Sequence, residues 1–323
     1  MLGCGTLGGP PASDRVPNAG VTGWHLLPAV PGTSIQEPFV FCPQEGVSHP
    51  AVVHQGPIWR MWLLTPDGNV RAASATDGLH DWTDDGPVDL PGGPWVDISV
   101  AELDGDWRVA ASSATGNLIR IFSSADASNW SASGSLAASA AWTAGEIGGP
   151  ALLGDRAMGG WRLFHAGARG SAIGIASSPD GSIWTEADEP LFTTASIQSE
   201  TGWSVLAIGA PAAGLDVSRP DRPVYKLWFE ASELRHLPTP SADELVEVIG
   251  FAGSFDAEQW IVWSGNPVFQ QRMITVPGAP TVFVPTREPS VVADGYTYRM
   301  FFDSPFALDG GPVRPCIAVA LDP

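Results

Sequence analysis

The stretch Trp-Arg-Leu-Phe at residues 161–164 decides the fold, because it has four relatives elsewhere in the chain. Each copy places an aromatic residue first, a basic residue second, an aliphatic residue third and usually an aromatic residue last. The only lysine of the chain, Lys226, occupies the basic position of one copy. A motif that recurs at intervals of tens of residues indicates a repeat architecture. The other copies are WRMW (59–62), WRVA (107–110), YKLW (225–228) and YRMF (298–301).

Two further strand patterns accompany every copy, and a turn with a Trp follows in four of the five units. The turn Asp is expected to accept bonds from nearby backbone N–H groups, and the Trp to pack between sheets. The preceding strands are HPAVV (49–53), DISVA (97–101), GPALL (149–153), APAAG (210–214) and EPSVV (288–292). The following strands are VRAAS (70–74), IRIFS (119–123), IGIAS (173–177), VIGFAG (248–253) and CIAVA (316–320). The turns are DGLHDW (77–82), DASNW (126–130), DGSIW (180–184) and DAEQW (256–260).

Four strands per unit, in units of roughly 50–75 residues, predict an all-β fold: a five-bladed β-propeller with four-stranded antiparallel blades. The fifth unit lacks an outer strand. The segment GWHLLPAV (23–30) matches the outer-strand pattern, so we expect it to pair with residues 316–320 and close the ring. The predicted organisation is one propeller over residues 21–323, preceded by a flexible tether at residues 1–20.

The basic residues of the repeated motif are predicted to be structural. The alternation of a β-strand puts neighbouring side chains on opposite faces of a blade. The five basic side chains are therefore expected to stack or form pairs between blades rather than to bind a ligand.

The charge balance limits the partners of the protein. The chain carries a net charge of −19 and has a pI near 4.4. Binding of nucleic acid or of an anionic membrane surface is not expected, because both need clustered Lys and Arg. No stretch is long and apolar enough to span a bilayer. A soluble monomer is expected, with membrane contact only through a lipid anchor.

The three cysteines bear on the compartment. Cys4 follows Leu-Gly and precedes a Gly/Pro/Ser-rich linker, as at a bacterial lipoprotein processing site, although the charged and apolar parts of a signal peptide are absent. One interpretation is a lipidated Cys4 and a secreted protein at the cell envelope; the other is that Cys4 is incidental. If Cys4 is lipidated, Cys42 and Cys316 are left as a pair that can form a disulfide in an oxidising compartment. The alternative is that they are two unrelated buried thiols.

The pattern of strands and turns over residues 21–323 resembles the five-bladed glycosidase propellers of glycoside hydrolase families 43, 32 and 62. The resemblance rests on residue–Pro pairs that open the first strands, on second strands such as YRMFF (298–302), and on third strands that run into IASSPDGSIW (175–184). It implies the fold and a carbohydrate partner, an oligosaccharide or a polysaccharide, but a fold does not by itself imply an activity.

In family 43 catalysis depends on three acidic residues at the starts of first strands. One is the general base, one is an Asp that tunes the pKa of the acid, and one is a Glu that acts as the general acid. At the matching positions this chain has His49, Asp97 and Gly149, so only Asp97 fits the family pattern. Glu146 lies three residues before Gly149, the position expected for the general acid. A rotated set of consecutive blades offers Glu288, His49 and Asp97. Two carboxyls with a histidine between them provide a candidate acid and base. Their origin on opposed blades predicts the wide spacing of about 6.5–9.5 Å that goes with inversion.

Other side chains are expected on the same rim. Trp95, Trp142 and Trp203 lie in loops that open there and are candidate platforms for sugar rings. The second strands end at His165, Glu230 and Asp303, which are candidates to bind hydroxyl groups or, with Asp97, a metal. No zinc spacing and no contiguous calcium loop is present, so no cofactor is predicted, although a structural Ca²⁺ in the funnel stays open.

Three functions remain open from the sequence. The first is a glycan-binding propeller outside the cytoplasm with degenerate catalytic acids. The second is an active, inverting glycoside hydrolase that uses Asp97 and Glu288. The third is a scaffold for a protein partner. Whether the protein is an enzyme is left undecided, and the positions of Asp97, Glu288 and His49 around the funnel are the deciding observation.

Overall fold

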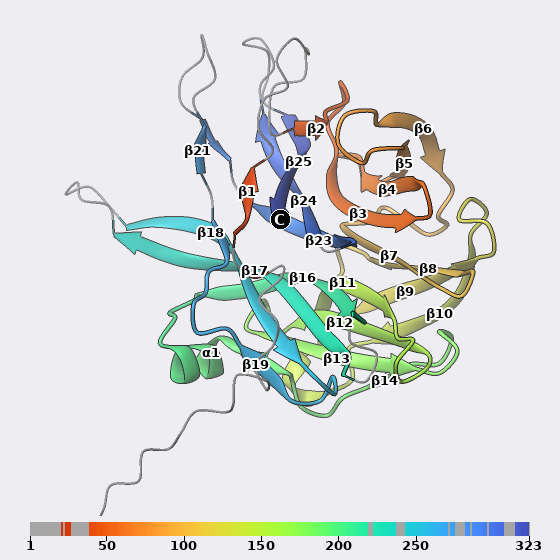
Figure 1. The fold of residues 1–323 in the computed structure, drawn as a ribbon. Helices are drawn as coiled ribbons and strands as arrows, with labels where there is room; N and C mark the ends of the chain where they lie inside the picture. Colours follow the sequence, from red (N-terminus) through yellow and green to blue (C-terminus); the bar gives the residue numbers. More distant parts are fainter. Residues whose placement is uncertain are drawn as a thin grey trace, which may run out of the picture.

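A computed structural model describes residues 21, 23–26, 39–218, 222–236, 243–270, 272–274, 282–284, 286–295, 297–306 and 314–322. Five antiparallel sheets follow one another around a central axis, so the predicted five-bladed propeller is confirmed (Figure 1). Blade 1 comprises β3 (Ser48–Gln55), β4 (Ile58–Leu64), β5 (Val70–Ala75) and β6 (Thr83–Val88). Blade 2 comprises β7 (Asp97–Leu103), β8 (Asp106–Ser112), β9 (Leu118–Ser124) and β10 (Ser131–Ala137).

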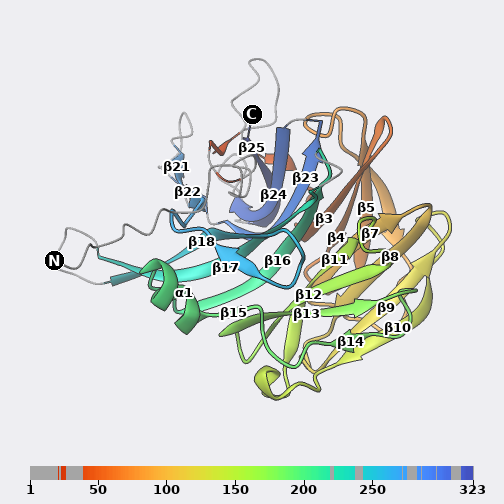
Figure 2. The ribbon, with the colours of Figure 1, turned by 60° about the horizontal axis from the view of Figure 1, so that its bottom comes forward.

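Blades 3 and 4 carry additional short elements at their outer edges. Blade 3 comprises β11 (Ile147–Gly154), β12 (Trp161–Gly167), β13 (Ala172–Ser178), β14 (Thr185–Glu186) and β15 (Phe192–Thr193). Blade 4 comprises β16 (Ala207–Asp216), β17 (Val224–His236), β18 (Asp243–Ser254), β19 (Trp260–Val262) and β20 (Phe269–Gln270). A 3₁₀ turn (Ala141–Thr143), helix α1 (Thr194–Thr201) and a small hairpin of β21 (Arg272–Ile274) and β22 (Val282–Val284) complete the description. The long β17 and β18 extend from the ring on the side where α1 lies (Figure 2).

Blade 5 closes the ring with strands from both halves of the chain. Its order is β1 (His25–Leu26), β25 (Arg314–Asp322), β24 (Thr297–Phe306) and β23 (Arg287–Asp294), and β2 (Phe39–Phe41) also pairs with β25. His25 pairs with Leu321 and Leu26 with Ala320, as the predicted closure requires. Trp24 is buried in the core between blades 4 and 5. Cys42 and Cys316 form a disulfide with Cα atoms 4.6 Å apart, which joins the N-terminal segment to β25.

The aromatic-basic motif forms a closed ring of contacts between blades. In every copy the basic side chain lies over the aromatic ring that opens the motif of the next blade. The distance from the charged group of the basic side chain to the centre of the ring lies between 4.3 and 6.0 Å in the five pairs. These distances are within the range of a cation–π interaction. The predicted structural role of the five basic residues is therefore confirmed. The pairs are Arg60–Trp107, Arg108–Trp161, Arg162–Tyr225, Lys226–Tyr298 and Arg299–Trp59.

The Asp turns and their Trp residues also lie as predicted. The Asp126 carboxylate, for example, accepts hydrogen bonds from the backbone N–H groups of Ser128 and Asn129. Trp130 then packs edge-on against Trp62 of blade 1, and Trp260 packs against Phe164 of the neighbouring blade. Each turn thus places a large ring in the core between two sheets, where its burial stabilises the contact between blades.

A backbone bulge opens four of the five first strands and sets the direction of the residue at the axis. His49, Gly149, Ala210 and Glu288 have φ angles of 54°, 54°, 38° and 49°, and each precedes a proline. The ladder with the second strand shifts register at each of these positions. Such a bulge re-aims a side chain at the end of a strand. Blade 2 lacks the proline, and Asp97 pairs regularly with Ser112.

Candidate functional site at the mouth of the channel

The five first strands surround a narrow channel along the propeller axis. The channel holds a cavity of about 70 Å³ lined mainly by proline, alanine, valine and serine residues. At the end where the first strands begin it opens into a wider cavity of about 260 Å³. Asp97, Glu288, Gly149 and Ala210 line both cavities. The wider cavity is also bordered by Glu146 and Arg169 and by several glycines, so a few charged groups lie at the edge of a largely apolar wall.

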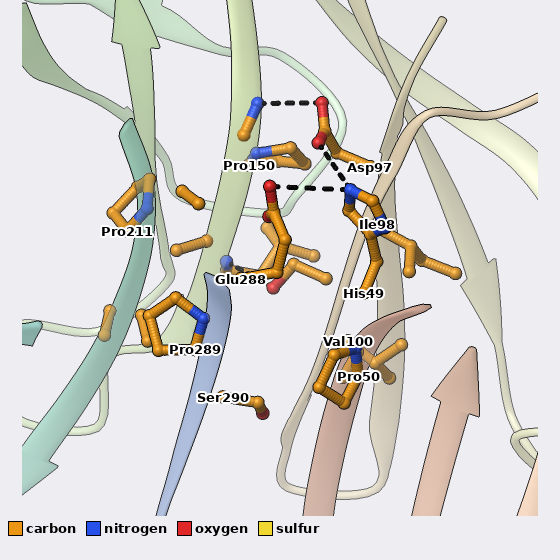
Figure 3. A pocket seen from close by; sticks show the side chains of 18 of the residues that line it. His49, Pro50, Asp97, Ile98, Val100, Pro150, Pro211, Glu288, Pro289 and Ser290 are labelled. Atoms are coloured by element: carbon orange, nitrogen blue, oxygen red, sulfur yellow. Dashed lines mark hydrogen bonds and ion pairs between the residues drawn. The ribbon is translucent and has the colours of Figure 1, made fainter. Parts of the chain in front are cut away.

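Three side chains from consecutive blades meet where the channel opens. His49 Nε2 lies 3.4 Å from Asp97 Oδ1 and 3.5 Å from Glu288 Oε1 (Figure 3). The side chains of His49, Asp97 and Glu288 are 23%, 19% and 24% exposed. Each is therefore accessible from the channel cavity although largely surrounded by protein. The rotated set predicted from the sequence is thus brought together in space, with the imidazole between the two carboxylates.

Neighbouring polar groups hold two of these side chains in place. Ser48 Oγ lies 2.9 Å from His49 Nδ1. Asp97 Oδ2 accepts hydrogen bonds from the Ser112 hydroxyl and from the Gly149 backbone N–H, the latter at 3.1 Å. Asp97 Oδ1 and His49 Nε2 consequently remain directed toward the axis. Ser112 was not among the predicted site residues, although its regular pairing opposite Asp97 follows from extending the two strands in antiparallel register.

The electrostatics of the site favour a charged His49 and an ionised Asp97. Burial alone would lower the pKa of His49, but the carboxylates of Glu288 and Asp97 outweigh this and raise the pKa to about 11. Burial acts to raise the pKa of Asp97, yet the bonds from His49, Ser112 and Gly149 lower it below its ordinary value. In the absence of another cation, the imidazole is charged and Asp97 is ionised at neutral pH.

A second group of acids lies beside Glu288, between blades 4 and 5. The Glu288 backbone N–H donates to Glu230 Oε2 at 3.2 Å. Burial and the nearby Glu288 raise the pKa of Glu230 to about 8, and the same two causes raise that of Asp303 to about 6. Asp303 Oδ1 is buried with no hydrogen-bond partner among the residues that the structure describes. Glu230 and Asp303, both predicted to reach the rim, therefore lie near Glu288, but neither lines the channel cavity or the wider cavity.

The two carboxylates approach each other closely. One oxygen of Asp97 and one oxygen of Glu288 lie within 4.8 Å of each other and of a His49 ring nitrogen. The spacing of about 6.5–9.5 Å that goes with inversion is defined between whole carboxyl groups, so the predicted wide spacing stays a prediction. The blades that supply the acids are separated by a single blade, and one imidazole nitrogen lies between both carboxylates. Glu146, the alternative acid, forms an ion pair with Arg169 at 3.3 Å on the exposed edge of the cavity.

The three loop tryptophans are not arranged as a platform. Trp95 is only 4% exposed, because it donates to the Leu90 carbonyl and packs against Phe122 in the core, so the prediction of a sugar platform there is wrong. Trp142 and Trp203 are half-buried against their own blades, where their indole N–H groups donate to the Ala187 carbonyl and the Glu233 carboxylate. Neither of these two lines the channel cavity or the wider cavity.

His165 is likewise unavailable to a ligand. Its side chain is fully buried beneath the Trp142 ring, with ring centres 5.3 Å apart, and its Nε2 lies 3.4 Å from Glu186 Oε1. The other Glu186 carboxylate oxygen accepts from the backbone N–H groups of Ser139 and Ala140. The prediction that His165 binds substrate hydroxyls is wrong, because the loop before blade 3 folds back and covers it.

This burial predicts an acid-sensitive fold. Burial lowers the pKa of His165 despite the neighbouring Glu186, whereas an unfolded histidine titrates near 6.5. Below about pH 6.5 His165 binds a proton in the unfolded chain that it excludes in the folded chain, so the His165 contribution to stability falls as the pH drops, by at most about 1.4 kcal/mol per pH unit. We expect His165→Gln to reduce the loss of melting temperature between pH 7.5 and pH 5.5. The exposed His80, changed to Gln, is the matched control; equal losses in all three proteins would contradict the prediction.

Cys4, the candidate lipidation site, lies outside the described residues. No helix in the described part of the chain is long and apolar enough to cross a membrane.

Comparison with known proteins identifies the fold. No protein-family model matches the chain, and no curated protein sequence matches it. Among solved structures, a thermostable family-43 glycoside hydrolase is 13% identical, with a TM-score of 0.59 over 85% of this chain and 88% of that one. A putative glycoside hydrolase from Parabacteroides distasonis is 15% identical, with a TM-score of 0.61 over 93% and 96%.

A third similar structure is described under the GH130 family of mannoside phosphorylases, which contains glycoside hydrolases that target β-1,2 mannosidic linkages in Candida mannan. It is 15% identical, with a TM-score of 0.61 over 95% of both chains. The fold of this protein thus resembles those of glycoside hydrolase propellers, as the sequence predicted. At these identities the likeness concerns the fold, and activity has to be argued from the site.

Proposed function

We propose that this protein is a glycan-directed propeller that binds an oligosaccharide or polysaccharide at the mouth of its channel. The wider cavity has the features of a small-molecule site: it is concave, it contains a few convergent polar groups, and it lies on the propeller axis. Asp97, Glu288 and Arg169 supply acceptors and donors for hydroxyl groups there. The similarity to glycoside hydrolase propellers supports a carbohydrate as the ligand.

Binding is favoured over inverting hydrolysis by one observation, the position of His49. Its Nε2 lies 3.4 and 3.5 Å from the two carboxylates, so both acids are engaged by the same nitrogen. An inverting enzyme instead places its acid and its base on opposite sides of the scissile bond, with room for a water. The acids at the axis are therefore arranged to hold a cation between them rather than to flank a glycosidic bond.

Hydrolysis with retention is the second candidate. Asp97 and Glu288 face the same cavity, and facing atoms within 4.8 Å are nearer to the spacing of about 5–5.5 Å that retaining enzymes use. In that case one carboxylate attacks the anomeric carbon while the other carboxyl group, in its protonated form, gives its proton to the leaving oxygen. Water then hydrolyses the glycosyl-enzyme, with the second group acting as the base. The third function, a scaffold for a protein partner, has no specific support at this site.

A location outside the cytoplasm is part of the proposal. The Cys42–Cys316 disulfide supports it, because such bonds persist in oxidising compartments. A lipid anchor on Cys4 would hold the propeller at a bacterial cell envelope. Mass spectrometry of the membrane fraction of a bacterial host that expresses the chain behind a lipoprotein signal sequence tests this. An unmodified Cys4 would reject the anchor.

The glycan proposal is tested with arabinan, xylan, fructan and mannan oligosaccharides. Calorimetry should detect binding of at least one class by the wild type, and Asp97→Asn and Glu288→Gln should each weaken it at least tenfold. Asp104→Asn, a matched change at a 79% exposed carboxylate in the β7–β8 turn, should leave it unchanged. Product analysis by NMR with the same panel separates binding from hydrolysis. If no class binds, the glycan proposal is rejected.

A further inference from the structure

The groups at the channel mouth form a set of metal-binding donor atoms. His49 Nε2, Asp97 Oδ1 and Glu288 Oε1 come from β3, β7 and β23 and point toward one another (Figure 3). Within the described residues this is the only set of three or more His, Cys, Asp or Glu donors so close together. The three residues provide one neutral nitrogen ligand and two negative oxygen ligands.

The two distances from His49 Nε2 fit ligands around one ion better than they fit hydrogen bonds. A charge-assisted bond from nitrogen to carboxylate oxygen is about 2.7–2.9 Å long, and one Nε2–H cannot donate fully to two acceptors. The observed separations from His49 Nε2 are 3.4 and 3.5 Å. Two ligands at about 2.1 Å from a tetrahedral ion lie about 3.4 Å apart.

The surrounding groups orient the donors as they do around bound metals. Ligating histidines usually bond through their second ring nitrogen, and ligating carboxylates are hydrogen-bonded in turn. His49 Nδ1 lies 2.9 Å from Ser48 Oγ, and Asp97 Oδ2 accepts from Ser112 and Gly149. These contacts leave Nε2 and Oδ1 as the free ligand atoms. The backbone also orients the donors of His49 and Glu288. Their φ angles of 54° and 49° are strained values that aim both side chains at the axis.

We propose that His49, Asp97 and Glu288 bind one divalent transition-metal ion, for which Zn²⁺ is the reference. The ion takes the Nε2 lone pair in place of a proton, and the two carboxylates neutralise its charge. One nitrogen and two oxygen ligands suit Zn²⁺, Co²⁺ or Mn²⁺, whereas Ca²⁺ requires six to eight oxygens. Because Asp97 and Glu288 also line the wider cavity, the fourth coordination position is open to a water or to a ligand in that cavity. This inference does not depend on the nature of the glycan.

The test is calorimetric titration of the chelator-treated, untagged protein with Zn²⁺, Co²⁺, Mn²⁺ and Ca²⁺. A Cys4→Ser background removes a thiol that could itself bind zinc, since Cys42 and Cys316 are bonded to each other. We expect one transition-metal ion per chain and a rise in melting temperature on binding. His49→Gln and Glu288→Gln should weaken binding at least hundredfold. Ser112→Ala should weaken it about 10–100-fold, as removal of an outer-shell partner does.

The control variant is Glu146→Gln, which removes a carboxylate from the same cavity but lies outside the donor set, and it should bind the metal as the wild type does. Circular dichroism identifies any variant that fails to fold, and Co²⁺ absorption spectra of the wild type report the geometry independently of all variants. No binding of any transition metal at millimolar concentration, undiminished binding in His49→Gln, or a preference for Ca²⁺ would each overturn the proposal. His49 would then bridge the carboxylates as an imidazolium.

Discussion

Replacing Lys226 with methionine is expected to lower the free energy of unfolding by about 3–5 kcal/mol. The Lys226 side chain is fully buried between blades 4 and 5. Its ammonium group lies 3.2 Å from the Asp216 carboxylate and 2.9 Å from the Tyr298 hydroxyl, and it lies over the Tyr298 ring. Methionine fills a similar volume but leaves a partly buried Asp216 without its cation, and this uncompensated charge is the main cost.

Urea unfolding at pH 7.5 measures the change in the free energy of unfolding. The equivalent basic residue of another blade provides the control. Arg60 occupies the same position in blade 1 but is only half-buried, and it lies 6.0 Å from the Trp107 ring. Arg60→Met should therefore cost only about 0.5–1 kcal/mol. Adding Asp216→Asn to Lys226→Met should recover part of the loss, because the two side chains are coupled. A Lys226→Met protein within 1 kcal/mol of the wild type would show that the buried contact contributes little.

Removal of the Cys42–Cys316 disulfide is expected to cost about 4–5 kcal/mol in the chain-entropy account. The two residues are 274 positions apart, so the bond closes a loop of most of the chain and restricts the unfolded state strongly. The bond also keeps β2 against β25 in blade 5, which joins strands from the two ends of the chain. Without it, the edge of β25 would be exposed more often, and an unpaired edge promotes aggregation.

Cys42→Ala/Cys316→Ala should show this loss in urea unfolding, and the wild type with reductant should match it. Cys4→Ser is the control for removal of a cysteine and should unfold as the wild type does. Light scattering near the melting temperature checks the aggregation. If the double variant is as stable as the oxidised wild type and remains monodisperse, the strand pairing at the seam is sufficient to close the ring.

The architecture could be predicted from the sequence because its determinants are local. Each blade repeats the same alternation of residues, the same Asp turn and the same aromatic-basic pair, and strand periodicity and turn chemistry act over a few residues. The repeat predicted that the basic residues stack or pair between blades, whereas the partner of Lys226, Tyr298, came from the structure. Closure by the segment that contains Trp24 followed from the one strand that the fifth unit lacked.

The candidate site was only partly predictable. That Asp97, Glu288 and His49 lie at the axis follows from their place at the starts of first strands. Their separation does not, because it depends on bulges at His49 and Glu288 that re-aim the side chains. Loop residues were the least predictable. Trp95 and His165 were expected at the rim but are buried, since the path of a loop depends on which distant surface it covers.

The sequence by itself therefore determined the number of blades, the strand order within them and the structural role of the basic residues between blades. Only the tertiary structure decided that one imidazole lies between two carboxylates, that Glu230 and Asp303 lie near Glu288, and that Trp95 is buried in the core. The physical reason is the distance along the chain over which each feature is determined. Repeats and turns are set by neighbours in the chain, whereas distances at the axis are set by how five separate blades pack around it.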